Sequence, residues 1–472
     1  MGPVVDDVLG LSHKPDEAEL LQLEQKYCSW GDTVHYLDPP KFFERAEGNY
    51  LYDREGIPYL DLQMWYSAAS FGYGNSRLNQ SLKDQIDRLP QLACQYLHPE
   101  KVQLSTAIAR LNESKFGRAG RVHFNVGGAQ AIEDSLKIVR NATGKSVVFA
   151  FMGGYHGRTL GASAITSSYR YRRRYGHFSD RAHFVPYPYC FRCPYDKKRE
   201  DCDLYCVKQF AKNFETEYNS FWDAKARESE FAAFYIEPIQ GTGGYVVPPV
   251  GYFPALKKIL DERGILLVDD EIQMGFFRAG KFWAIENFDV VPDIVVFGKA
   301  LTNGLNPLSG IWAREELINP DTFPPGSTHS TFSANTLGTA VGLEAVRMMT
   351  ETNYEEIVRR KGSYFLAQLK ALQAKYPRVI GDTDGIGLAL RIEICREDGR
   401  LPDRELTDRI FAEGMKGNLD ARGRPMGLVL DVGGYFKNVF TLAPCFEMTE
   451  DEIDLAVELF EQLIRRCAPD RT

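Results

Sequence analysis

Continuous apolar runs alternate with amphipathic stretches through the middle of the chain. Residues 147–150, 234–236, 265–268 and 294–297 are apolar or aromatic throughout and rich in β-branched side chains. Such runs are typical of strands whose two faces are both covered by helices, whereas a strand with one solvated face alternates between apolar and polar positions. The pattern therefore predicts a large α/β domain over residues 73–344, with a mostly parallel sheet flanked by helices.

The two ends of the chain follow different patterns. Up to residue 72, short strand-like runs alternate with turns, as in residues 49–56, which predicts an N-terminal arm and part of a small sheet. In the region 345–472, Thr449 and Glu452 have the spacing of a capping box, and apolar residues recur at helical spacing from Ile453 onward. We therefore expect the N- and C-terminal parts to form a small α+β domain closed by an amphipathic helix.

Composition narrows the class of protein. The 472 residues are 44% hydrophobic and 25% charged, which suits a globular protein of two or three packed domains. The net charge of -8 and the lack of a long basic stripe argue against nucleic acid as a partner. No apolar stretch reaches the roughly 18 residues needed to cross a membrane, so a membrane is not expected as a partner either. Nine cysteines without a signal-like N-terminus favour a reducing, cytoplasmic location.

A glycine-rich turn is a candidate cradle for a phosphate group. Gly127, Gly128 and Ala129 are small and precede a helical stretch, so backbone N–H groups can approach an anion where the helix dipole is positive. The alternative is that these glycines simply form a turn ahead of the helix. The P-loop and dinucleotide-loop fingerprints fail elsewhere in the chain, because Val139 and Val246 stand where each motif needs a glycine.

Two charged residues follow buried strands. Asp270 comes at the end of the run 264–270, where it could hold a protonated ring nitrogen or act as a simple loop acid. Lys299 follows the run 294–297, and an ammonium group that leaves a buried strand must be paired or lose its charge. A lowered pKa is what an imine-forming lysine requires. Tyr155, in a second glycine-rich turn, could stack on an aromatic ring or simply pack in the turn.

These four features have the chemistry that pyridoxal phosphate requires, namely a phosphate cradle, a carboxylate, an aromatic face and a lysine. The segment 270–280 (DEIQMGFFRAG) is followed 19 residues later by Lys299 in the segment FGKAL. In this order, the motifs resemble those of the class III aminotransferases, the fold-type I pyridoxal-phosphate enzymes that include ornithine, 4-aminobutyrate and ω-amino acid aminotransferases. The resemblance extends from about residue 49 to residue 464.

The resemblance implies a role for each motif. Lys299 would bind the cofactor aldehyde covalently, and Asp270 would pair with the ring nitrogen. The other implied contacts are Gly128 and Ala129 at the phosphate, Tyr155 and Ile272 on the two ring faces, Gln273 at the ring hydroxyl, and Thr331 at the phosphate held by a neighbouring subunit. The last contact implies a homodimer whose active sites are shared across the interface.

The reaction that the resemblance implies is transamination. An amine, diamine or ω-amino acid donor would give its amino group to a keto acid or aldehyde acceptor by a ping-pong mechanism, with the freed Lys299 moving a proton. A pyridoxal-phosphate racemase or epimerase on the same fold is the alternative. A catalytically inactive binding homologue is a weaker one, because Asp270 and Lys299 are both intact.

The substrate side departs from the family pattern. Thr441 and Asp431 stand at the two positions where branches of the family carry a carboxylate-binding arginine. Glu237 resembles the glutamate that pairs with the first arginine, so it could receive a cationic substrate group, cap a loop, or pair with another arginine. Arg158 stands where a distal carboxylate binds in some relatives but also occurs in others. Trp65 and Tyr66 resemble an aromatic pocket wall or core packing.

A cysteine-containing insertion at about residues 189–206 is the least typical feature. Cys190 and Cys193, followed by Cys202 and Cys206, have a spacing compatible with a tetrahedral zinc site. Related loops occur in some 4-aminobutyrate-like members of the family without implying a metal. We therefore expect reduced structural thiols in preference to zinc, and a partner-docking loop remains a further alternative.

Overall fold

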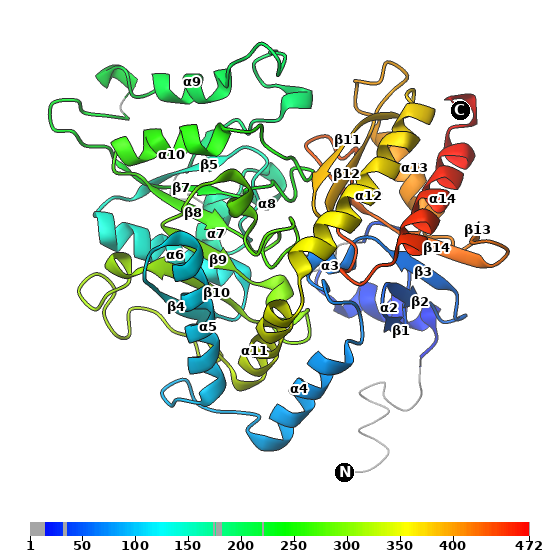
Figure 1. Ribbon diagram of the computed structural model, residues 1–472. Helices are drawn as coiled ribbons and strands as arrows, with labels where there is room; N and C mark the ends of the chain where they lie inside the picture. Colours follow the sequence, from blue (N-terminus) through cyan, green and yellow to red (C-terminus); the bar gives the residue numbers. More distant parts are fainter. Residues whose placement is uncertain (1–14, 32–34, 173–174, 176–181, 220, 472) are drawn as a thin grey trace.

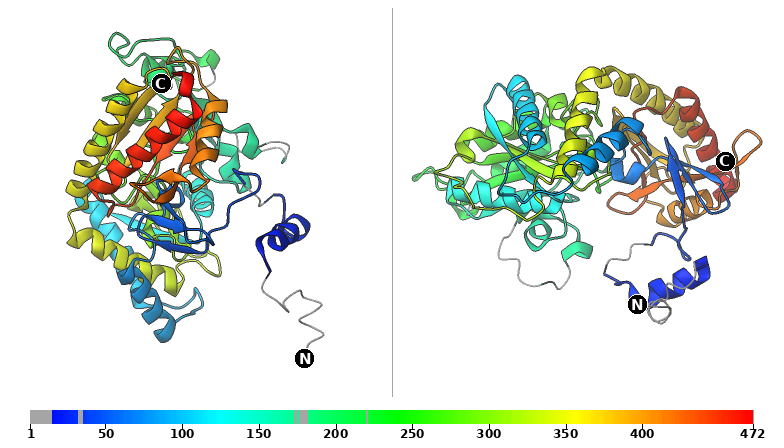
Figure 2. Two further views of the ribbon diagram at one scale, coloured as in Figure 1. Left: turned by 90° about the vertical axis from the view of Figure 1, so that its right-hand side faces the viewer. Right: turned by 90° about the horizontal axis from the view of Figure 1, so that it is seen from below.

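The computed structural model describes residues 15–31, 35–172, 175, 182–219 and 221–471. Two domains lie side by side, a large one built around a seven-stranded sheet and a small one that combines both ends of the chain (Figures 1 and 2). No helix in these described ranges is both long and apolar enough to cross a membrane.

The large domain is built on one mixed sheet. All its neighbouring strands are parallel except β10, which runs antiparallel to both β4 and β9. In spatial order, the strands are β4 (Gly120–Asn125), β10 (Ser309–Arg314), β9 (Ile294–Phe297), β8 (Leu266–Asp270), β7 (Phe231–Ile236), β5 (Val147–Phe151) and β6 (Ala182–Val185). The four apolar runs of the sequence are thus β5, β7, β8 and β9, as predicted.

Helices cover both faces of this sheet, which explains the continuous apolar runs. In β8, Leu267 packs in one core cluster with Leu256 of α10, while Val268 packs in another with Ile132 of α6. Every residue of β7, β8 and β9 is buried as a result. The covering helices are α4 (Ser76–Arg88), α5 (Pro99–Phe116), α6 (Gly128–Thr143), α7 (Leu160–Ile165), α9 (Tyr205–Lys212), α10 (Tyr252–Glu262) and α11 (Thr336–Glu351).

The small domain joins the two ends of the chain through β3, which pairs in parallel with β14 so that Leu60 is opposite Leu428. One sheet consists of β1 (Arg45–Glu47), β2 (Tyr50–Tyr52), β3 (Pro58–Asp61), β14 (Pro425–Val429) and β13 (Leu419–Asp420). The other consists of β11 (Ile380–Ile386), β12 (Ala389–Ile394), β16 (Val439–Leu442) and β15 (Asp431–Gly433). Its longer helices are α12 (Tyr354–Lys375), α13 (Arg404–Gly414) and α14 (Glu450–Cys467).

The helix α14 starts as the sequence predicts. Thr449 Oγ1 accepts a hydrogen bond from Glu452 N at 3.1 Å, and Glu452 Oε2 accepts one from Thr449 N at 2.8 Å. The predicted boundary between residues 344 and 345 falls inside the continuous helix α11. That helix packs on α4 and α5 of the large domain, and Tyr354 and Val358 at the start of α12 belong to the same core cluster.

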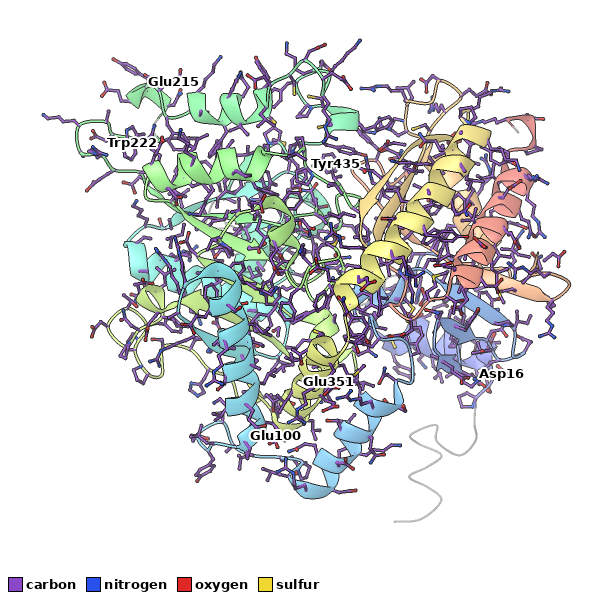
Figure 3. All side chains as sticks on the ribbon, viewed as in Figure 1. Asp16, Glu100, Glu215, Trp222, Glu351 and Tyr435 are labelled. Atoms are coloured by element: carbon purple, nitrogen blue, oxygen red, sulfur yellow. The ribbon has the colours of Figure 1, made fainter. Side chains whose placement is uncertain are left out.

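The cysteine-containing insertion connects the two domains. Tyr189 and Arg192 reach across to Glu393 of β12, and Arg391 Nη1 donates a hydrogen bond to Tyr189 OH at 2.5 Å. A second bridge is Tyr435, which lies between the domains and donates a hydrogen bond from its hydroxyl to Met152 O at 2.8 Å (Figure 3). The contacts of Tyr189 and Arg192 fix the insertion against the small domain, while that of Tyr435 joins the small domain to the end of β5.

Candidate active site

A cavity of about 770 Å³ lies beyond the carboxyl ends of the large-domain strands. It brings together residues that are far apart in the sequence, because strands β4, β5, β7, β8 and β9 all end near it. The predicted residues that line it are Trp65, Tyr66, Gly128, Ala129, Tyr155, Arg158, Glu237, Asp270, Ile272, Gln273 and Lys299. Another cavity, of about 860 Å³ between the insertion and the small domain, is lined by none of these residues.

Lys299 lies at the first position after β9 and its glycine, with a backbone φ of +39°. Burial lowers the pKa of its ammonium group to about 8, although the charges of Asp270, Glu237 and Asp431 act in the opposite direction. A lysine with this pKa is partly neutral near physiological pH, which is the form that attacks a carbonyl carbon.

Asp270, the last residue of β8, is held in one orientation. Its Oδ1 accepts a hydrogen bond from Ile272 N at 3.1 Å, and its Oδ2 lies 2.7 Å from His156 Nδ1. Burial lowers the pKa of His156, but the hydrogen bond and charge of Asp270 outweigh it and leave the pKa raised. Sequence reasoning missed His156, and its only signal was its place beside Tyr155 in the second glycine-rich turn.

The start of α6 forms an open phosphate cradle. Gly127 is the N-cap, and no side chain accepts the N–H groups of the first helical turn. A Cβ atom built on Gly128 would meet Ile272 Cδ1 at 2.8 Å, so a side chain there would collide with the residue expected on one ring face. Ser309 adds a buried hydroxyl in the cavity wall whose Oγ has no hydrogen-bond partner within the described structure.

The ring-sized part of the cavity is bordered by fixed side chains. Tyr155 packs edge-on against Tyr171 with the ring centroids 5.2 Å apart, and its backbone N–H donates to Glu237 Oε1 at 2.9 Å. Gln273 Nε2 donates to Tyr245 OH at 2.9 Å. One cavity therefore contains the phosphate cradle, the carboxylate, the lysine and the side chains that border the ring. Together these residues fit pyridoxal phosphate.

Trp65 and Tyr66, which form the aromatic wall of the cavity, lie on a strained turn. Residues 64–67 have φ values of 44°, 52°, 56° and 66°, a left-handed turn without glycine. Trp65 is 56% exposed, and Tyr66 OH lies 3.2 Å from Tyr36 OH. Four non-glycine residues with positive φ thus occur where the aromatic wall meets the cavity. The surrounding structure must therefore hold this turn in place.

Glu237 fixes a loop, as one of its predicted roles requires, and it also lines the cavity. Its Oε2 accepts a hydrogen bond from Gly241 N at 2.9 Å, in addition to the bond from Tyr155 N. Burial raises the pKa of its carboxyl group to about 7. Arg158 does not pair with it, since its guanidinium carbon lies 4.6 Å from the centroid of the Tyr171 ring.

Asp431 and Thr441 do not line the cavity directly. They are joined to each other, because Thr441 Oγ1 donates to Asp431 Oδ2 at 2.6 Å across the β15–β16 pair. Thr331 is also absent from the cavity wall and lies exposed on the surface of this single chain.

The cysteines of the insertion do not form a metal site in the described residues. All four thiols are free, and no cluster of three or more His, Cys, Asp or Glu side chains in the ranges given above could hold a metal ion. Burial raises the pKa of Cys206 to about 11, so in the absence of a metal this side chain is a protonated thiol. The zinc alternative receives no support from this arrangement.

Known proteins of similar sequence and shape include aminotransferases and an amino acid racemase. The model of the class-III aminotransferase family matches residues 33–464. An alanine/serine racemase from Pyrococcus horikoshii is 30% identical over 96% of this chain and 91% of its own, and an ornithine aminotransferase from an Exiguobacterium species is 28% identical over 95% and 98%. The structure of a Bacillus anthracis aminotransferase has a TM-score of 0.83 at 25% identity, covering 96% of this chain and all of its own.

These matches confirm the fold class, the cofactor and the enzyme class that the motifs predicted. They also cover nearly the whole chain, so both domains have counterparts in the relatives. The chain belongs to the class III aminotransferase family and is a fold-type I, pyridoxal-phosphate-dependent transaminase.

Proposed function

We propose that this enzyme transfers an amino group from an amine, diamine or ω-amino acid donor to a keto acid or aldehyde by a ping-pong mechanism, with Lys299 and Asp270 as its catalytic residues. The observation that carries the proposal is the placement of Lys299 and Asp270 at the ends of adjacent strands, in one cavity. Bound in this cavity, pyridoxal phosphate supplies an electron sink that acidifies the carbon bearing the donor's amino group.

Residues of this chain transfer the proton, keep the ring nitrogen protonated and hold the cofactor. Lys299 Nζ takes the proton from that carbon, because its lowered pKa leaves part of it neutral and able to act as a base. Asp270, oriented by His156, keeps the ring nitrogen protonated. When pyridoxal phosphate is bound, Gly128 and Ala129 would hold its phosphate through backbone N–H groups, Tyr155 and Ile272 would pack against its ring, and Gln273 would contact its hydroxyl.

We infer that two copies of the chain share each pair of active sites. Thr331 is exposed, and the neighbouring Phe332 is 69% exposed, so this loop is available to contact a second subunit. The helix α2 (Glu17–Tyr27) has no buried residue and lies apart from the body of the small domain (Figure 2). A helix of this length is marginal without packing partners, which fits an arm that docks on a partner subunit.

Racemisation is the second candidate, because the alanine/serine racemase is 30% identical over 96% of this chain. The two reactions share the lysine and the proton abstraction. They differ in where the proton returns, since a racemase gives it back to the opposite face of the same carbon and needs no carbonyl acceptor.

The donor half-reaction separates these candidates. The purified holoenzyme is mixed with single donors in the absence of acceptor, while its visible absorbance and the chirality of the donor are followed. Transamination removes the absorbance band of the lysine-bound cofactor, one equivalent for each donor converted. Racemisation leaves this band in place and inverts the configuration of the donor. Lys299→Ala should abolish the band, and Lys258→Ala on the exposed face of α10 should retain it. A band that survives in Lys299→Ala would refute the lysine assignment.

A further inference from the structure

The segment between β10 and α11 contains a short exposed turn. Ser330 and Ser333 close this turn, because the Ser333 N–H donates to Ser330 O at 3.1 Å and the two hydroxyl oxygens lie 2.8 Å apart. Thr331 and Phe332 stand between them, and both are exposed. The single chain therefore already forms this turn, which presents a hydroxyl group and an aromatic ring on its outer side.

Both ends of the turn are anchored to the large domain. On one side, Thr328 Oγ1 donates to Asp134 Oδ1 of α6 at 2.7 Å and accepts from Lys137 Nζ of the same helix at 2.8 Å. On the other side, Ala334 O lies 3.1 Å from His98 Nε2. The Thr328 hydroxyl thus has both an acceptor and a donor as partners, which fixes its direction as well as its position.

Asp134 is a rigid anchor, because both oxygens of its carboxylate have partners. Its Oδ2 accepts a hydrogen bond from Asn125 Nδ2 and lies 3.1 Å from His123 Nε2, and both of these residues belong to β4. Its Oδ1 also accepts from Lys137 Nζ at 2.9 Å. Burial raises the pKa of Asp134, but these hydrogen bonds outweigh it and hold the pKa well below its ordinary value. The anchor therefore stays ionised.

The helix that holds the turn is also the helix that begins at the phosphate cradle. Gly128 and Ala129 start α6, while Asp134 and Lys137 lie further along it. Direct side-chain hydrogen bonds thus connect Thr328, three residues before Thr331, to the helix that carries the cradle. The position of the turn is set by a regular element and not by the course of a long loop alone.

We propose that the hydrogen bonds between Asp134 and Thr328 align Thr331 with the cofactor phosphate in the neighbouring subunit's active site, so that Asp134 is a positioning residue. This inference rests on the proposed sharing of active sites between two copies of the chain. A hydroxyl group binds a phosphate oxygen only over a narrow range of distance and angle. Each α6 then serves two sites, its own cavity through its N-terminus and the partner's through the turn.

The test measures the dissociation constant of pyridoxal phosphate by titration of the full-length apoenzyme. Thr328 is substituted in preference to Asp134, because Asp134 is buried and also bonds to β4. Thr331→Ala removes a hydrogen bond to a charged group and should raise the constant by roughly tenfold or more. Thr328→Val keeps the side-chain shape but loses the hydroxyl, and should raise it by about threefold to tenfold. Thr328→Ser restores the hydroxyl and should bind as wild type.

A double variant separates positioning from a general effect on the structure. If Thr328 acts through Thr331, adding Thr328→Val to Thr331→Ala should change the dissociation constant little further, whereas independent effects multiply. Pyridoxal lacks the phosphate, so the wild type and all these variants should bind it equally well. Thr350→Val on the exposed side of α11 is the matched control and should change neither constant.

The outcomes distinguish this inference from the proposals on which it rests. Effects that multiply in the double variant, or a Thr328→Val variant that weakens pyridoxal as much as pyridoxal phosphate, overturn the inference. If Thr331→Ala weakens cofactor binding and Thr328→Val does not, the sharing of active sites stands and this inference alone fails. If Thr331→Ala leaves the dissociation constant unchanged, the role of Thr331 across the interface fails and the inference fails with it.

Discussion

His156 Nδ1 lies 2.7 Å from Asp270 Oδ2, and both side chains are buried at the end of β8. The two residues are 114 positions apart in the sequence, yet the imidazole fixes the orientation of the carboxylate that faces the cavity. A carboxylate held in this way is ready to pair with a protonated ring nitrogen, so the contact links a residue outside the predicted motifs to the catalytic residue Asp270.

Replacing His156 should therefore weaken catalysis without unfolding the protein. A hydrogen bond to a charged group contributes about 1.5 to 3 kcal/mol, so His156→Ala should lower kcat/KM by roughly tenfold to hundredfold. The loss should be accompanied by a weaker affinity for the cofactor, measured by absorbance titration of the apoenzyme. His35→Ala, which removes an exposed imidazole paired with Glu24, serves as the control. Equal activity in both variants would show that the Asp270 contact is dispensable.

The adjacent glycines of the cradle should respond differently to substitution. A Cβ atom at Gly128 would lie 2.8 Å from Ile272 Cδ1, whereas one at Gly127 would meet nothing within 4 Å. We expect Gly128→Val to weaken cofactor binding by at least about tenfold, because the valine displaces Ile272 and narrows the ring site. Gly127→Ala should bind the cofactor almost as wild type. Cofactor dissociation constants of the two variants, compared at one pH, decide the matter, and similar values for both would contradict the cradle geometry.

The pH dependence of stability should reveal a buried proton beside the active site. Burial raises the pKa of Asp269 well above its ordinary value and that of Glu271 to about 7, and the two carboxyl groups interact. The folded protein therefore binds more protons than the unfolded chain between about pH 4.5 and pH 7. The pair's contribution to stability is fully present at the acid end of this window and is lost as the pH rises, by up to about 1.4 kcal/mol per pH unit for each extra proton bound.

Asp269→Asn should flatten this dependence, because the amide needs no proton to remain neutral. The free energy of unfolding, measured by denaturant titration at several pH values, should fall less steeply between pH 5 and pH 7 in the variant than in the wild type. Asp408→Asn at the surface provides the matched control. Parallel curves for wild type and Asp269→Asn would exclude a retained proton on this pair.

The contact between the insertion and the small domain should contribute to stability. The Tyr189 hydroxyl is buried between Glu393 and Arg391, so Tyr189→Phe leaves these charged groups without one hydrogen-bond partner. We expect a loss of about 1 to 3 kcal/mol in the free energy of unfolding. Tyr218→Phe removes a hydroxyl from a side chain that is 89% exposed and should change little. Denaturant unfolding of both variants tests this, and equal stabilities would mean that the insertion rests passively on the small domain.

Much of the large domain could be predicted from local patterns. Strands β7, β8 and β9 are buried on both faces, and this requirement leaves uninterrupted apolar runs that are visible in the sequence. Asp270 and Lys299 stand out because each follows such a run directly. The predicted boundary at residue 345 falls inside helix α11, which is buried over most of its length, so its sequence does not show which domain it packs on.

The sequence by itself determined the strands, the motif order and hence the family and cofactor, because burial and backbone chemistry restrict which residues can stand at those positions. Only the tertiary structure decided that His156 contacts Asp270, that Tyr189 of the insertion bonds to Glu393, and that Gln63 and Thr441 hydrogen-bond to Asp431. These contacts join residues from separate elements, in the last case 368 positions apart for Gln63 and Asp431. Their energies depend on distance and burial, which the folded chain sets and local sequence patterns do not encode.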